Sequence, residues 1–183
     1  KGALNEGYHA ESIIVTRQSH LDINEMLLSK IFACIDMGEG KYIPYSGILV
    51  EMEAIRKVDD YYFYRVVIVP KVWLLTQSRG NRIFLDKTIP EILEAVLIDG
   101  GLMQSDFEFR LKGDHYRKWE YICQYSESHF DFLVRWLEYS GMYFFHEGTD
   151  EGEKLVITDT KIAHTYSPFA TVLNYRTTTG LES

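Results

Sequence analysis

The chain has 183 residues, of which 46% are hydrophobic, so it is long enough and apolar enough to bury a core in one domain or two small ones. Aromatic residues make up 14% of it, with 13 Tyr and 10 Phe, and this favours β-sheets, where flat rings pack on a half-buried pleated surface. The formal net charge of -8 argues against nucleic-acid binding, because phosphate binding depends on clustered Lys and Arg. We therefore expect a β-rich protein whose partner is another protein.

The two cysteines, Cys34 and Cys123, lie far apart in apolar segments. We expect buried thiols rather than a disulfide, since disulfide frameworks normally show more cysteines in a shorter chain, and this fits a reducing compartment. No apolar run approaches the ~20 residues that cross a bilayer, and residues 1–20 lack the apolar centre of a signal peptide. The sequence thus predicts no membrane-spanning segment and no signal peptide. We also expect it to be part of a longer protein, because no terminal element follows Gly180.

The pattern of the first 77 residues predicts mainly strands. The segment Ile43–Ile55 is broken by Gly47 and then alternates between apolar and polar residues, as a strand with a bulge does. A turn at Asp59-Asp60 leads into Tyr61–Val69, whose only charge is Arg65, so we expect both faces of this strand to be at least half covered. Further expected elements are a strand at Glu11–Thr16, a helical turn within Asp22–Leu28 and an apolar run at Ser29–Ile35. Together they predict an antiparallel hairpin inside a barrel or sandwich.

Two helices are predicted by their start and stop signals, after an expected loop at Ser78–Asn81. In the first, Thr88 is the cap, and Glu91 stands three residues later, where it can reach back to the cap N–H. In the second, Ser128 is the cap and Asp131 lies in the first turn. Glycines end both helices, at Gly100-Gly101 and at Gly141. Strands are expected at Phe107–Leu111, Met142–His146 and Leu155–Thr158. The last two flank the turn-rich segment Glu147–Glu153, which is typical of a hairpin. The fold class is therefore α+β, mainly β, with an α+β unit over 78–160 and an extended return over 161–183.

A search for catalytic and metal-binding patterns finds none. No two histidines have the i, i+4 spacing of a zinc site; they are His9, His20, His115, His129, His146 and His164. Ser128, His129 and Asp131 have the residue types of a hydrolase triad, but three residues at one helix start cannot aim at one another. Carboxylate pairs such as Glu127 and Asp131 carry little weight, because 27 acidic residues will place some pair at the spacing of a glycosidase by chance. We predict no catalytic residue, no cofactor and no metal.

The stretch from Glu120 to Phe145 is the most informative part of the chain. It contains Glu120-Tyr121, Gln124-Tyr125, Glu127-Ser128, Asp131-Phe132, Arg135, Leu137-Glu138, Gly141 and Tyr143. This order resembles the E-Y-x-x-Q-Y-x-E-S-x-x-D-F-x-x-R-x-L-E-x-x-G-x-x-Y-x-F block of VgrG-type spike proteins of type VI secretion, relatives of the hub of contractile phage tails. The aromatic residues after Gly141 are shifted slightly against the family spacing. Gly47, Trp73, and Arg82 with Phe84 match shorter family segments upstream, so the resemblance covers roughly residues 45–159 in collinear order.

The resemblance implies a hub fold made of two small β-barrels and an α+β insertion. Residues 1–77 would then be part of the first barrel, 78–160 the insertion, and 161–183 a return toward a second barrel that is mostly absent. In this family three chains form a homotrimeric ring that matches a hexameric tube protein, caps the secreted tube and is driven through the target cell envelope, with secreted effectors as further partners. The resemblance also implies assembly in the bacterial cytoplasm followed by secretion through the contractile apparatus. A phage tail hub is the alternative, and an envelope-degrading hydrolase is a third hypothesis.

Individual residues of the block allow two interpretations. Asp131 and Arg135 have the i, i+4 spacing of a helical ion pair, which together with capping explains the charges locally, although a subunit contact is the other possibility. Trp73, Trp119 and Trp136 could anchor an interface, but a core position is the default expectation for each of them. Trp119, beside charged neighbours, is the best candidate for an interface residue.

Overall fold

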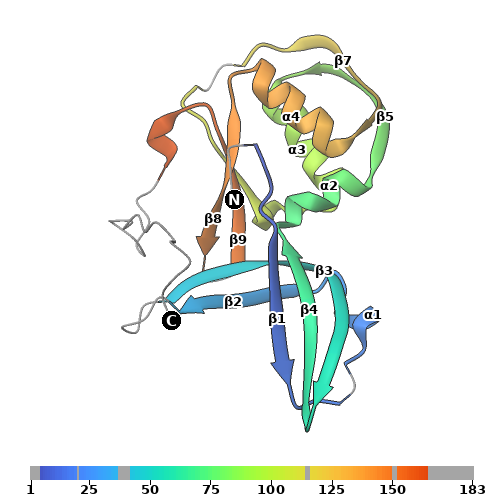
Figure 1. The fold of residues 1–183 in the computed structure, drawn as a ribbon. Coiled ribbons are helices and arrows are strands. Elements are labelled where there is room, and N and C mark those ends of the chain that lie inside the picture. Colours follow the sequence, from blue (N-terminus) through green and yellow to red (C-terminus); the bar gives the residue numbers. More distant parts are fainter. Residues whose placement is uncertain (1–4, 20, 37–41, 114–115, 150–151, 165–183) are drawn as a thin grey trace, which may run out of the picture.

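The computed structural model describes residues 5–19, 21–36, 42–113, 116–149 and 152–164, and Figure 1 shows that they form two β-rich parts. A four-stranded antiparallel sheet lies at one end of the molecule. A second part, in which helices pack on strands, lies at the other end. Two antiparallel strands, β8 (Tyr143–Thr149) and β9 (Gly152–Thr158), extend between this second part and the four-stranded sheet.

The four-stranded sheet has the order β1-β4-β3-β2. Its strands are β1 (Ala10–Thr16), β2 (Lys30–Asp36), β3 (Tyr42–Val58) and β4 (Tyr61–Val69). The predicted bulges of the third strand are confirmed, but the register shifts follow Leu49 and Ala54 rather than Gly47. Gly47 has a different role, because a Cβ there would lie 2.4 Å from the backbone oxygen of Val69.

Both faces of this sheet are covered at the end near Val69. On one face Leu49, Met52, Tyr64 and Val66 pack against apolar residues of and around α1 (Ile23–Met26), which is capped by the Asp22 carboxylate. On the other face, apolar residues of β3 and β4 pack against the segment that follows β4. The expected coverage of β4 is thus confirmed at this end.

The edges of the sheet are open. Within the described residues β1 pairs with β4 alone and β2 with β3 alone, so the four strands form an open sheet and not a closed barrel. Both edge strands carry exposed apolar side chains, namely Ile13, Ile14 and Val15 on β1 and Phe32 and Ile35 on β2. An apolar edge of this kind favours pairing with a further strand.

A two-stranded antiparallel ribbon, β5 (Arg79–Lys87) with β7 (Trp119–Ser128), forms the outer side of the second part. The loop predicted at Ser78–Asn81 is wrong, because β5 begins at Arg79. Gly80, which suggested the loop, lies at a register shift between β5 and β7. A Cβ at this position would lie 2.8 Å from the His129 side chain. Glycine is therefore required here by close packing rather than by a turn. A 3-10 helix (Lys71–Trp73) and α2 (Leu74–Gln77) connect the four-stranded sheet to this ribbon.

Both predicted helices are confirmed with their caps. Helix α3 (Ile89–Asp99) begins with a capping box between Thr88 and Glu91, and Gly101 follows it with a φ of 96°. Helix α4 (His129–Tyr139) is capped by Ser128, and Gly141 follows it with a φ of 67°. These positive φ angles explain why glycine stands after each helix.

Replacing Glu91 by Gln should make the stability of the fold depend less on pH in the acid range. The pKa of the Glu91 carboxyl lies below its usual value, first because it accepts a hydrogen bond from the Thr88 N–H at 2.7 Å. A carboxylate with a lowered pKa stabilises the fold above its unfolded pKa, and this contribution is lost as the pH falls through the folded pKa. Urea midpoints should therefore fall less between about pH 7 and about pH 3 in Glu91→Gln than in the wild type. Glu138→Gln, at an exposed position of α4, is the control, and equal slopes in all three proteins would contradict the prediction.

The third sheet has the order β6-β9-β8 and is made of β6 (Phe107–Arg110), β8 (Tyr143–Thr149) and β9 (Gly152–Thr158). The predicted strand at Phe107–Leu111 and the predicted β8–β9 hairpin are confirmed, the latter with longer strands than expected. Strand β6 runs parallel to β9, a pairing that local sequence patterns do not reveal. A 3-10 helix (Lys161–Ala163) follows, and beyond His164 the predicted extended return lies outside the described residues.

The main core fills the space between the helices, the ribbon and the third sheet. Its fully buried side chains include Phe132, Leu133, Leu137, Phe144 and Ile157. The predicted burial of the cysteines is wrong, since both thiols are free and exposed. Both lie on strands at positions that point away from the buried face, so apolar neighbours in the sequence did not indicate burial. No helix among the described residues is long and apolar enough to cross a membrane.

Candidate functional site

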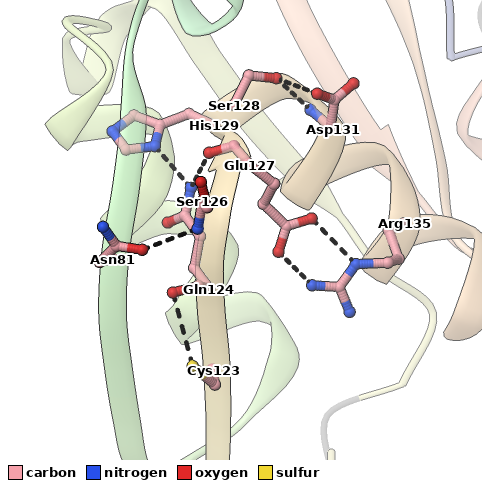
Figure 2. A network of polar contacts seen from close by, with 9 residues as sticks. All are labelled: Asn81, Cys123, Gln124, Ser126, Glu127, Ser128, His129, Asp131 and Arg135. Carbon is pink, nitrogen blue, oxygen red and sulfur yellow. Dashed lines mark hydrogen bonds and ion pairs between the residues drawn. The ribbon is translucent and has the colours of Figure 1, made fainter.

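The block Glu120–Phe145, which carries the family resemblance, comprises most of β7, all of α4 and the start of β8. Figure 2 shows the polar contacts where β7 meets α4. Strand β7 ends at Ser128, which is also the cap of α4. The Ser128 hydroxyl accepts a hydrogen bond from the Asp131 N–H at 2.9 Å and donates to the Asp131 carboxylate at 2.7 Å. His129 points to the opposite side, toward Gln124 (Figure 2). The three residues therefore form a helix cap and not a hydrolase triad.

Replacing Ser128 by Ala should destabilise the protein by about 1 kcal/mol, in the range of about 0.5–2 kcal/mol measured for helix caps. The side chain is buried, and its loss leaves the Asp131 N–H without its acceptor. Urea denaturation of the variant measures this change. Ser105→Ala, at an exposed position, is the matched control and should change stability by less than about 0.5 kcal/mol. Equal stabilities of the two variants would show that the cap contributes nothing.

A polar chain, buried at Gln124 and His129 and open to solvent at Asp99, joins four elements behind this cap. The Gln124 side chain is fully buried, and its amide donates to His129 Nδ1 at 2.9 Å and to the backbone oxygen of Glu127 at 3.4 Å. Because Nδ1 accepts, the proton of the neutral ring lies on Nε2, which is 3.2 Å from the Asp99 carboxylate. Asp99 also forms an ion pair with Arg82 at 2.9 Å. The chain thus links β5, α3, α4 and β7 and fixes how the ribbon lies on the helices.

Sequence reasoning identified only the two ends of this chain. Arg82 and Gln124 belong to the matched family segments, whereas Asp99 and His129 were not singled out for this role. Asp99 is the last residue of α3 and lies far from the block in sequence. No local pattern could have shown that it faces His129.

The predicted ion pair between Asp131 and Arg135 is wrong. Arg135 binds Glu127 with two hydrogen bonds instead, at 3.2 Å from Nε and 2.5 Å from Nη2 (Figure 2). The Asp131 carboxylate is already engaged by Ser128, and the planar guanidinium matches the two oxygens of Glu127. This contact ties the end of β7 to the second turn of α4.

The other matched residues fall into an inner and an outer set. Phe84, Phe132 and Leu137 are buried, and the Phe84 and Phe132 ring centroids are 5.8 Å apart. The outer set consists of Glu120, Tyr121, Tyr125 and Glu138, which are exposed. The Tyr143 hydroxyl donates to the Thr160 backbone oxygen at 3.1 Å.

The three tryptophans are partly buried and pack against core residues, as expected by default. Trp73 lies beside the cluster on the four-stranded sheet, and Trp119 and Trp136 lie beside the main core. The Trp119 ring packs edge-on against Trp136 at 5.6 Å and carries the Arg117 guanidinium at 5.0 Å. One side of Trp119 is therefore occupied within the chain.

A second polar cluster lies where the four-stranded sheet meets β8 and β9. The Glu153 carboxylate accepts hydrogen bonds from the Tyr8 hydroxyl and from the Lys71 N–H, and it lies 3.2 Å from His146 Nδ1 without hydrogen-bond geometry. Burial, and then the neighbouring Glu153 carboxylate, raises the pKa of Tyr8 above its ordinary value. An adjoining cavity of about 240 Å³ has both charged and apolar walls. Glu153 thus connects the two parts of the molecule.

The geometry gives no arrangement of a nucleophile and its base in the block. Within the described residues, no three His, Cys, Asp or Glu side chains are placed to hold a metal ion. Two of the six histidines, His20 and His115, lie outside the described residues. What the block does present is a rigid, hydrogen-bonded support on one side and exposed aromatic residues on the other.

The family of the chain follows from comparison with known proteins. Residues 2–183 match the family described as phage tail baseplate hub (GPD), so the chain belongs to this family. Among curated proteins it is 30% identical over 173 residues to the type VI secretion system spike protein VgrG1b of Pseudomonas aeruginosa, covering 94% of this chain and 23% of that protein. The spike protein VgrG1a of the same organism is 31% identical over 169 residues, covering 91% of this chain and 26% of that protein. The resemblance seen in the sequence is thereby confirmed.

Solved structures share the fold. The E. coli c3393 protein, a component of the type VI secretion system, matches with a TM-score of 0.77 and 22% identity over 89% of this chain and 45% of that one. The 43 kDa tail protein of prophage MuSo2 from Shewanella oneidensis matches with a TM-score of 0.53 and 16% identity over 83% of this chain and 46% of that one. The chain spans about a quarter of the length of the two curated spike proteins above.

Proposed function

We propose that this chain is the first part of a spike hub that caps the secreted tube of a type VI secretion apparatus and takes part in puncturing target cell envelopes. The observation that carries the proposal is the four-stranded sheet with two open edges, on a chain that belongs to the baseplate hub family. Among the described residues, β1 and β2 each pair with a strand on one side only, and both expose apolar side chains. Such sheet edges are stabilised when a further strand pairs with them. The missing pairing is supplied by the rest of the hub.

In the assembled protein, residues 1–77 belong to the first hub barrel, 78–160 to an α+β insertion and 161–183 to the return toward a second barrel. The four strands close into a barrel or continue into neighbouring units when the hub forms. Three chains make a ring whose pseudo-sixfold symmetry matches a hexameric tube protein. Open edges at both sides of one sheet support such a ring, because a head-to-tail contact repeats until it closes.

The role of this region is mechanical and not enzymatic. The Glu127–Arg135 contact and the polar chain from Arg82 to Gln124 support this, because they tie the strands of the ribbon to the helices. The actin cross-linking toxin VgrG1 of Vibrio cholerae matches 46% of this chain but only 8% of its own length, so its named activity gives no support for an activity here. The protein is made in the bacterial cytoplasm, binds tube protein and effectors there, and leaves through the contractile apparatus.

Deleting the gene in the bacterium that carries it tests the proposal. We expect release of the hexameric tube protein into the medium to stop and to return when the gene is restored. A phage tail hub would instead leave secretion unchanged and abolish the formation of intact tail particles. Unchanged secretion with intact particles would overturn both functions.

A further inference from the structure

Residues 5–9, here called the strap, cross from the second part of the molecule to the four-stranded sheet. Asn5 lies against β8, where its N–H donates to the Phe144 backbone oxygen at 3.3 Å and its side-chain oxygen accepts from the Phe144 N–H at 2.9 Å. At Ala10 the chain enters the four-stranded sheet as β1. Figure 1 shows the strap, in dark blue, leading from the second part to that sheet.

Tyr8 is the residue of the strap that contacts strands of both parts. Its hydroxyl lies within hydrogen-bond distance of the Ser46 backbone oxygen on β3 and of the Glu153 carboxylate on β9. Its ring packs against Tyr45 of β3, with 4.8 Å between the centroids, and edge-on against His146 of β8 at 5.1 Å. One partly buried side chain thus joins the sheet to the β8–β9 hairpin.

The rest of this junction is incompletely packed. A cavity of about 240 Å³ lies between the two parts. Its walls come from both of them and include Leu28, Lys30, Ile48, Leu102, His146 and Leu155. Protein interiors are close-packed and contain few voids larger than a water molecule, so a space of this size leaves side chains of the two parts without mutual contacts. Packing therefore holds the two parts together less firmly than it holds each part internally.

The covalent connection between the parts is also short. Among the described residues, the backbone passes from the four-stranded sheet to the second part once, at Pro70, where β4 ends and the 3-10 helix Lys71–Trp73 begins. A Cβ at Gly7 would lie 3.1 Å from the Pro70 ring, so the strap lies directly on this connection. A few residues at the end of an element are the usual place of a hinge.

We propose that the strap is a latch that sets the angle between the two parts, and that the connection after Pro70 is the hinge on which they turn when the latch opens. The single backbone crossing and the cavity leave the angle weakly determined by packing. The contacts of Asn5 and Tyr8 then determine it, because they bind β8 and β9 on one side and β3 on the other. This device goes beyond the proposed hub function and does not depend on it.

The two native cysteines allow the angle to be measured. Cys34 lies on β2 of the sheet and Cys123 on β7 of the second part, and both thiols are free and exposed. With a nitroxide on each thiol, double electron–electron resonance gives the distribution of distances between the parts. Dilution with unlabelled protein restricts the signal to pairs within one chain. The wild type should give one narrow distribution, and Tyr8→Ala should broaden it at least twofold.

Two controls show that a broader distribution comes from motion between the parts. Tyr61→Ala, at the end of β4 away from the junction and 40% exposed, should leave the Cys34–Cys123 distribution as in the wild type. In Cys34→Ser with Ile162→Cys, both labels lie on the second part, and Tyr8→Ala should leave their distances unchanged. Circular dichroism shows whether each variant is folded.

Tyr8→Phe is the variant that decides the test if Tyr8→Ala does not fold, because it keeps the ring and removes only the hydroxyl contacts. It should also broaden the distribution between Cys34 and Cys123. A folded Tyr8 variant with the wild-type distribution, or a wild type as broad as the variant, would overturn the latch. Neither result bears on tube release by the whole protein, which tests the hub function alone.

Discussion

Replacing Phe132 by Ala should lower the free energy of unfolding by about 3–5 kcal/mol. The side chain is fully buried at the point where α4 meets the β5–β7 ribbon, and its ring lies 5.8 Å from Phe84 and 6.3 Å from Trp136. Truncation removes the buried ring and leaves a cavity that neighbouring elements, held by the polar chain from Arg82 to Gln124, cannot close. Urea denaturation followed by tryptophan fluorescence measures the loss.

The matched control for Phe132 is Ile162→Ala, because Ile162 is 85% exposed. This variant should change the free energy of unfolding by less than about 0.5 kcal/mol. If Phe132→Ala lost less than about 1 kcal/mol, the packing of α4 against the ribbon would not be the core of the second part.

The second large effect is expected at Gly47, where Ala should destabilise the protein by about 1–3 kcal/mol or more. A Cβ at this position would lie 2.4 Å from the backbone oxygen of Val69 and 2.9 Å from a methyl group of Ile68. The backbone oxygen cannot move away as a flexible side chain can, so β3 and β4 must separate locally. Thermal unfolding of the variant measures this cost.

Gly148 supplies the control for Gly47. It lies on an exposed part of β8, and a Cβ there would meet nothing within 4 Å. Gly148→Ala should therefore be neutral or stabilise the protein by up to about 1 kcal/mol, since Ala restricts the unfolded chain. Equal destabilisation by the two substitutions would mean that close approach to Val69 is not what requires Gly47.

Elements with local signals could be predicted from the sequence. The caps at Thr88 and Ser128 and the glycines after both helices were correct, because a cap involves residues only three positions apart. The β3–β4 and β8–β9 hairpins were correct for the same reason. The resemblance block also pointed to the right region, and its family is confirmed.

What could not be predicted depends on contacts between distant residues. The parallel pairing of β6 with β9 and the contact of Asp99 with His129 join segments that carry no shared pattern. The i, i+4 spacing favoured Asp131 as the partner of Arg135, but Asp131 is engaged by Ser128 and Arg135 binds Glu127 instead. The exposed cysteines show the same limit, because a strand places successive side chains on opposite faces.

The two ends of the chain's structure have different properties. The four-stranded sheet has open, apolar edges suited to pairing within a hub, and the second part holds its ribbon rigidly on a helical support. Glu153 and Tyr8 connect the two parts through a partly buried, hydrogen-bonded junction. Such a junction supports the mechanical role that we propose.

Electron cryomicroscopy of the full-length protein bound to rings of the hexameric tube protein tests the central claim most directly. We expect three copies around the end of one tube ring, with β1 and β2 of each copy continued by strands of the surrounding hub. A complex with one or two copies, or one in which these edges face solvent, would contradict it.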